Sequence, residues 1–486
     1  MLISLDFLRA GARWPPEAEK DRLQTYRDNR RLYEDEHSEV YIEQMRRIER
    51  INDDYTRAIA YPVIINYQRL MSTKIADLVF GEPPTITAPN ERQQQIIDNI
   101  LTDTDLLNVA YMAAIDVSRY GDGLMLMGIR DGKPVVDVTS PMHWYPVVDP
   151  ANIRRIMYHV FCWQYAVDDY YRDWRLRVQI HNPEDPTQCE QHTYKLNGLA
   201  GSWTIGNDLI TDDDNIIDTG LGICPVYRIS NMLTSDRVYG LDDYQAIDSI
   251  VSELIVRISQ VSRVLDKHAN PSMSGPATAL DQDPISGAYH MRAGGYYPRV
   301  DSSEPEVKYI TWDASMDANF RQIELLTNQL YTVSEMGSAI FGDLTNKTGE
   351  VPSGSALRRL MMSPLAKARR IANKFDPILK QLISACATVY GEDIPVKDIT
   401  ITWADGLPDD EGELANIMAV RTGNRPTISQ HTAIKRLDGA SDKDASAELD
   451  EIRADDNVED MGSEPIFDVD TVQKPESTDD QPNGVI

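Results

Sequence analysis

The side chains that most often carry out chemistry are few in this sequence, and their spacing forms no familiar site. Four of the eight histidines share one region, but His143, His159, His181 and His192 do not have metal-ligand spacing. The sequence contains no glycine-rich loop ending in Lys-Ser or Lys-Thr, no GxGxxG and no HExxH. We therefore expect no catalytic site, no resident cofactor and no bound metal.

The cysteine and serine residues also indicate that the chain has no catalytic site. The cysteines never form a CxxC pair, and their spread fits reduced thiols better than a disulfide framework; they are Cys162, Cys189, Cys224 and Cys386. Ser353-Gly354-Ser355 is not the GxSxG of a nucleophilic serine, and it precedes a predicted helix as an N-cap would. These residues therefore predict packing and capping rather than covalent catalysis.

Two acidic runs could bind a divalent cation, namely Asp212-Asp213-Asp214 and Asp409-Asp410-Glu411. The alternative is a solvated loop for the first and a helix N-terminus for the second, where acidic side chains complement the helix dipole. We favour this alternative, with a structural calcium or magnesium ion as the other possibility.

Charge is distributed unevenly along the 486 residues, which carry a net charge of −29. Residues 441–486 hold 15 Asp and Glu against 3 Lys and Arg, and from residue 456 onward we expect an acidic, disordered tail. The densest basic stretch lies in residues 355–380 and includes Arg358, Arg359, Lys367, Arg369 and Arg370. Affinity for phosphate groups comes from clustered Lys and Arg, so the overall charge argues against tight binding to nucleic acid.

The first half of the chain changes its hydrophobic period once. Helical spacing predicts helices over residues 17–52 and 63–80, and two more within 91–120. Beyond Gly121-Asp122-Gly123 the pattern alternates, which predicts strands at 124–129, 135–139, 153–160, 175–180, 192–196 and 226–230. A β-rich unit on a helical base is therefore expected.

The second half is mainly helical. Long helices are predicted over residues 236–268 and 316–340, with short β-like segments between them at 296–300 and 307–312. A helix over 355–390 contains Pro364 and Pro377, each of which should kink or break it. A strand at 399–403 and helices at 411–422, 427–437 and 441–454 follow. The fold class is α+β, and because no run reaches about 20 apolar residues we expect no membrane span. Asp6 and Arg9 interrupt the apolar N-terminal residues and no small-residue cleavage site follows, so we expect no signal peptide.

Several motifs occur in an order that resembles phage portal proteins. Asn231-Met-Leu followed by Gly240-Leu-Asp-Asp-Tyr-Gln-Ala-Ile-Asp248 is similar to the family's entry into its first stem helix, and Ala269-Asn270-Pro271 to its exit. The segment Gly349-Glu-Val-Pro-Ser-Gly-Ser-Ala-Leu-Arg-Arg-Leu360 resembles the family's Ser-Gly-x-Ala-Leu. Tyr61–Asn66, Ala76–Pro84 and Gly121–Leu124 look like the family's opening helix and wing strands.

The resemblance implies a portal fold, siphophage-type, divided as follows: a wing at 1–236; stem helix 1 at 237–268; a β-rich clip at 269–312; stem helix 2 at 313–341; the tunnel loop, kinked tunnel helix and returning wing strand at 342–404; a small helical crown at 405–455; and the acidic tail at 456–486. It implies no enzymatic activity. It also implies a virion location, at the capsid portal vertex, after assembly in the host cytoplasm.

The same resemblance implies roles for particular residues. The tunnel loop would touch double-stranded DNA in the channel through Asp343, Thr345, Asn346, Lys347, Thr348, Gly349 and Glu350. Some of the basic residues at 358–370 would face DNA, and most would pair with acidic neighbours at subunit contacts. Tyr296, Tyr297 and Trp312 would contact partners from the clip, with core packing as the alternative.

The implied partners are a ring of identical subunits, usually twelve, the DNA, the terminase large subunit, a head-tail adaptor, and the major capsid and scaffolding proteins. Two other readings are another virion structural or scaffolding protein, which would form no ring with a DNA-width hole, and a nuclease acting through an acidic metal site. The nuclease would need carboxylates that converge on one cleft.

Overall fold

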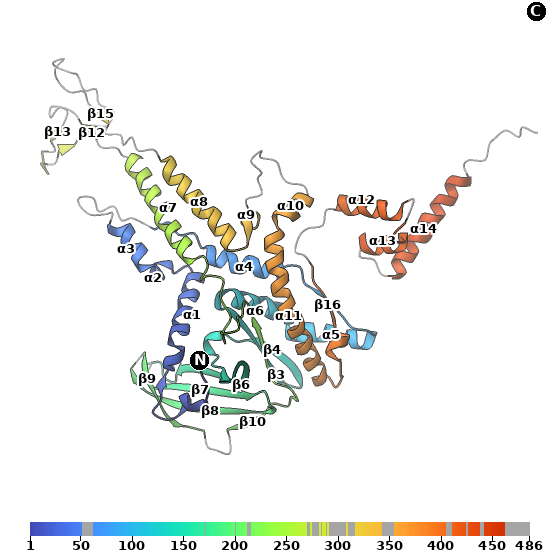
Figure 1. Cartoon of the computed structure of the whole chain (residues 1–486), viewed down its shortest axis with the longest axis horizontal. Coiled ribbons are helices and arrows are strands. Elements are labelled where there is room, and N and C mark those ends of the chain that lie inside the picture. The colour runs from blue at the N-terminus through green and yellow to red at the C-terminus, as the bar shows by residue number, and fades with distance from the viewer. Residues whose placement is uncertain are drawn as a thin grey trace, which may run out of the picture. The chain divides into compact units, whose positions relative to one another are not determined.

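The structure is a computed structural model (Figure 1). It describes residues 1–50, 62–170, 172–199, 201–210, 215–269, 316–342, 354–404, 411–423, 426–437 and 442–461, with short pieces at 273–274, 281–282, 284–287, 289–290 and 308–309. The chain forms two compact units, Met1–Leu407 and Pro408–Ile486. The basic helix, the junction and the hollow described below belong to the first unit.

The helix predicted over 17–52 is wrong as a single element, because it consists of α1 (Lys20–Tyr33), α2 (His37–Val40) and α3 (Ile42–Arg50). Asp35 ends α1 in the left-handed region at φ 74°, a conformation that closes helix C-termini. The next helix, α4 (Tyr67–Phe80), begins later than predicted because Asn66 caps it, accepting a hydrogen bond from the Arg69 N–H at 2.8 Å. The pair predicted within 91–120 is confirmed as α5 (Glu91–Thr104) and α6 (Leu106–Tyr120).

The β-rich unit is confirmed and comprises two sheets. One contains β11 (Val226–Ser230), β3 (Asp122–Arg130) and β4 (Lys133–Val138) in that order. The other has the order β1-β9-β8-β7-β6-β5, with β10 also paired to β8; its strands are β1 (Arg13–Trp14), β5 (Val147–Asp149), β6 (Asn152–Ala166), β7 (Trp174–Asn182), β8 (Asp185–Leu199), β9 (Ser202–Asp208) and β10 (Ile216–Asp218). The sequence pattern missed β1, β5, β9 and β10.

The three-stranded sheet connects two layers of apolar side chains. Met125 and Met127 on β3 belong to a large core shared with α4, α6 and the long helices. Leu124, on the opposite face of β3, packs with Trp144 and Phe161 of the larger-sheet region. The alternation of side chains along a strand explains how one strand serves both cores.

The first long helix is α7 (Asp248–Ala269), so the predicted start at residue 236 is wrong by twelve residues. The preceding segment is extended because Leu241 pairs with Met232 in an isolated antiparallel bridge. Figure 1 shows α8 (Asp317–Val333) beside α7. The helix predicted over 316–340 is likewise broken, because Glu335 has φ 60° and α9 (Gly337–Ile340) begins only after it.

The helix predicted over 355–390 is divided at Met361 into α10 (Gly354–Leu360) and α11 (Met362–Val389). Pro364 lies in the first turn of α11, where its missing N–H removes no intrahelical bond. The break expected near Pro364 is thus confirmed, whereas α11 continues through Pro377. The returning strand is confirmed as β16 (Thr400–Thr402), which pairs with β2 (Thr85–Thr87).

Between α7 and α8, the described residues include two small antiparallel pairs, β12 (Met273–Ser274) with β15 (Lys308–Tyr309), and β13 (Asp281–Gln282) with β14 (Tyr289–His290). The second unit contains the three predicted helices, α12 (Glu411–Thr422), α13 (Gln430–Leu437) and α14 (Asp442–Met461). Because α14 extends to Met461, disorder predicted from residue 456 is wrong for 456–461, and the rest of the tail lies outside the described residues.

Candidate functional site: the basic helix and the junction behind it

The exposed part of the basic stretch is smaller than the sequence suggests. Arg358 and Arg359 on α10 and Arg369 on α11 are exposed. Arg370 instead forms an ion pair with Glu335 at 2.5 Å, and Lys380 pairs with Asp376 at 2.8 Å within α11. Arg370 and Lys380 are therefore paired with acidic residues of the same subunit.

Lys367 departs furthest from the sequence expectation, because only 5% of its surface is exposed. Its ammonium group lies 2.9 Å from Asp243 Oδ1 and donates to the Ser334 carbonyl at 3.0 Å. A buried charge needs such partners, because removing it from water is costly. Lys367 is therefore not available to DNA or to a neighbouring subunit in this arrangement.

Asp243 belongs to a junction that precedes α7. Its Oδ1 accepts from the Asn231 side-chain amide at 3.1 Å, and its backbone N–H donates to the Ser118 carbonyl at 2.9 Å. The same Asn231 amide donates to the Leu241 carbonyl at 3.1 Å. One side chain thus ties the end of β11 to the entry of α7.

Two glycines allow the chain segments in this junction to touch. A Cβ on Gly240 would lie 2.0 Å from the Gly121 carbonyl oxygen, and one on Gly121 would lie 2.3 Å from that of Gly240. Gly121 also has φ +83°, a conformation in which glycine is favoured. The motifs around 121 and 240, distant in sequence, therefore form one contact.

Asp122 stabilises this contact from inside the protein, where it is fully buried. One oxygen accepts from Arg228 at 2.8–2.9 Å and from the Ser230 hydroxyl at 2.7 Å, and the other accepts from the Gly240 N–H at 2.9 Å. The nearby Lys374 is less well compensated: burial, together with the Arg370 guanidinium, lowers the pKa of Lys374.

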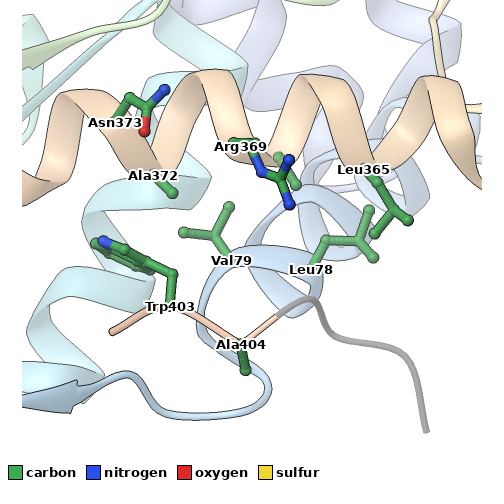
Figure 2. A pocket seen from close by; sticks show the side chains of 9 residues that line it. Leu78, Val79, Leu365, Arg369, Ala372, Asn373, Trp403 and Ala404 are labelled. Carbon is green, nitrogen blue, oxygen red and sulfur yellow. The ribbon is translucent and has the colours of Figure 1, made fainter. Parts of the chain in front are cut away.

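A small hollow of about 170 Å³ lies on the other side of α11 (Figure 2). Leu78 and Val79 of α4 form its floor, and Trp403 closes one end. The indole N–H of Trp403 donates to Asp376 at 3.2 Å, and its ring packs edge-on against Phe80. Arg369 is the charged side chain among the lining residues.

The remaining predicted site residues lie outside the described residues. They are Asp343, Thr345, Asn346, Lys347, Thr348, Gly349 and Glu350 of the expected tunnel loop, and Tyr296, Tyr297 and Trp312 of the expected clip. Asp212-Asp213-Asp214 and Asp409-Asp410 lie outside as well. In the described ranges, no three His, Cys, Asp or Glu side chains gather as metal ligands would, and no helix is long and apolar enough to cross a membrane.

Comparison with known proteins decides the family. A family model described as "Phage portal protein, SPP1 Gp6-like" matches residues 15–460. The chain belongs to this phage portal protein family. Membership supports a role as a portal, a structural connector component of a virion, and the family is a non-enzymatic one.

Solved structures similar to this portal protein come from gene transfer agent (GTA) particles. A chain of the neck of the empty GTA particle is 12% identical, with a TM-score of 0.46; the match covers 76% of this chain and 89% of that chain. A chain of the neck of the native GTA particle is 13% identical, with a TM-score of 0.43, and the match covers 78% and 96% respectively. Among curated proteins, no sequence matches this chain.

The sequence did hold a signal for the buried position of Lys367 in this portal protein. Lys367 is three residues after Pro364 and four before Ile371, both buried on α11, so it occupies the apolar face of the helix. Its partner Asp243 could not be found in the same way, because the sequence pattern predicted a helix from residue 236, whereas Asp243 precedes α7.

Proposed function

We propose that this chain is the subunit of a closed ring, usually of twelve copies, that forms the channel for double-stranded DNA at one capsid vertex. The observation that carries this proposal is the match of the portal family model to nearly the whole chain, residues 15–460. A head-to-tail interface that closes on itself gives such a ring. The ring would pass the genome during packaging and ejection.

The two long helices support the proposed stem. Apolar side chains on α7 and α8 point away from the shared core, including Leu265, which is 54% exposed, Phe320 at 52% and Leu325 at 59%. Burying exposed apolar side chains such as these at an interface would stabilise assembly. In the proposed ring, this surface is covered by the neighbouring subunit.

Residues 342–354 form the proposed tunnel loop, connecting α9 to α10. Its polar side chains and glycines would line the narrowest part of the channel, and Lys347 would contact the DNA backbone. The exposed arginines Arg358, Arg359 and Arg369 are further candidates for DNA or subunit contacts. The large acidic excess of the chain would keep the remaining wall from gripping phosphates.

The other partners follow from the same proposal. The clip, residues 269–312, would dock the terminase motor during packaging and a head-tail adaptor afterwards. The crown, residues 405–455, would point into the capsid. The subunit itself would hydrolyse no nucleotide, because the motor supplies the energy.

The substitution Lys347→Glu tests the tunnel loop. We expect intact rings but altered packaging or retention of DNA in a reconstituted system, because a positive contact becomes repulsive to phosphate. Lys397→Glu is the matched control, since Lys397 is exposed and lies far along the chain from the loop. Packaging that is equal in both variants and the unaltered protein would contradict a role for Lys347.

A further inference from the structure

Lys367 lies where three parts of the fold meet. The lysine itself is on α11, the Ser334 carbonyl that it contacts ends α8, and Asp243 lies in the segment that leads from the β-rich unit into α7. Ser334 precedes Lys367 by 33 residues, and Asp243 precedes it by more than a hundred. A single buried ammonium group is within bonding distance of both of the other parts.

We infer that Lys367 is a positioning residue that couples the wing, through the segment that leads from it into α7, to helices α8 and α11. This inference rests on the proposed function for its biological meaning, but the coupling itself is a property of the folded chain. Substituting either member of the ion pair would then change the local stability on both sides of the junction.

The contacts of Glu335 show how α11 holds the turn between α8 and α9. Glu335 has a left-handed backbone conformation, which is unfavourable for a residue with a Cβ and persists only where the surroundings impose it. Helix α11 supplies those surroundings: Lys367 holds the Ser334 carbonyl, the Ser363 hydroxyl donates to the Glu335 carbonyl at 3.0 Å, and Arg370 pairs with the Glu335 carboxylate. The α8–α9 turn is therefore held in place by side chains of α11.

On the wing side, Asp243 transmits the position of the lysine to the β-rich unit. Asn231 and Ser118 bond to Asp243, and Gly240 is fixed against Gly121 through Asp122. The bonds of Ser118 and Gly240 involve backbone atoms, and the side chains of Asn231 and Asp122 are buried. A displacement of α11 would therefore break bonds on the wing side or carry that side with it.

Lysine suits this role better than an apolar residue of equal length. Its ammonium group bonds to Asp243 and to the Ser334 carbonyl at once, and an apolar side chain would leave both groups without these bonds. An apolar residue would pack at this position but would connect nothing. The cost of burying the charge is offset only while both partners stay in place.

The test is a double-mutant cycle on the full chain, read by amide hydrogen exchange. The variants are Lys367→Met, which keeps the length and removes the charge, Asp243→Asn, and the two combined. We expect each single variant to raise exchange at least tenfold both at residues 334–342 and at residues 231–247. The double variant should exchange much more slowly than the product of the two single effects predicts, because both substitutions remove the same link.

The control is Lys380→Met, which removes an ion pair on the same helix whose partner, Asp376, is also on α11. Its effect should stay within α11. If Lys367→Met does not fold, Asp243→Asn alone remains informative, because it should raise exchange at 334–342, where Asp243 makes no direct bond among those described. Exchange that changes only beside each substituted residue, or effects that simply multiply, would overturn the inference, whether or not the chain forms rings.

Discussion

Two glycines and one aspartate determine how closely the β-rich unit approaches the long helices. Gly121 and Gly240 bring their backbones to a separation that leaves no room for a Cβ on either residue. Asp122 then satisfies the Gly240 N–H and the Arg228 guanidinium with one carboxylate.

The substitution Gly240→Ala tests this directly. The added methyl group would clash with the Gly121 carbonyl, so we expect a loss of about 3 kcal/mol in the free energy of unfolding. Chemical denaturation gives that value. The matched control is Gly128→Ala on β3, where a Cβ meets nothing within 4 Å and the change should stay within about 0.5 kcal/mol. Equal losses in the two variants would contradict the close contact.

At the residue scale, the sequence predicted where the basic residues lie but not which of them are exposed and which are buried. It identified the basic stretch at 355–380, and Arg358, Arg359 and Arg369 are indeed exposed. Lys367 is buried instead because its position on α11 faces the core, and its partner is more than a hundred residues away. Ion pairs between distant segments follow from tertiary structure, which periodicity does not encode.

At the scale of elements, the chain breaks its long helices at residues with unusual backbone conformations. Asp35 divides the first predicted helix, at 17–52, and Glu335 divides the one at 316–340, both at positive φ. Such residues carry no clear sequence signal, because aspartate and glutamate are also common inside helices. Proline was the better guide: the break near Pro364 was predicted, although Pro377 is accommodated within α11.

The apolar surface of α8 carries the element-scale prediction. Leu325→Glu places a charge on a surface that the proposed ring covers, so we expect ring assembly to weaken at least tenfold while the subunit remains folded. Mass measurement across a range of protein concentrations, with circular dichroism on the same samples, gives both values.

The control is Gln95→Glu, which adds the same charge at an exposed polar position on another helix, α5. Assembly of this variant should be close to that of the unaltered protein. A Leu325→Glu variant that assembles equally well would show that this surface of α8 is not the one the neighbouring subunit covers.

At the scale of the whole molecule, the acidic composition and the proposed channel are compatible. An acidic wall with a few positive groups would let DNA slide, because phosphates are repelled from most of the surface and held only weakly at the rest. The order of the elements was largely predictable from the sequence: helical base, β-rich unit, long helices and returning strand. The two-sheet arrangement and the junction at Gly240 were not, because both depend on contacts between segments far apart in the chain.

The central claim is that this chain assembles into a ring around a DNA-width hole. Negative-stain electron microscopy of the purified protein, with a mass measurement on the same sample, tests it most directly. The account predicts closed rings of about twelve subunits with a central hole wide enough for a duplex. A compact monomer or dimer at high protein concentration and across salt conditions would contradict it.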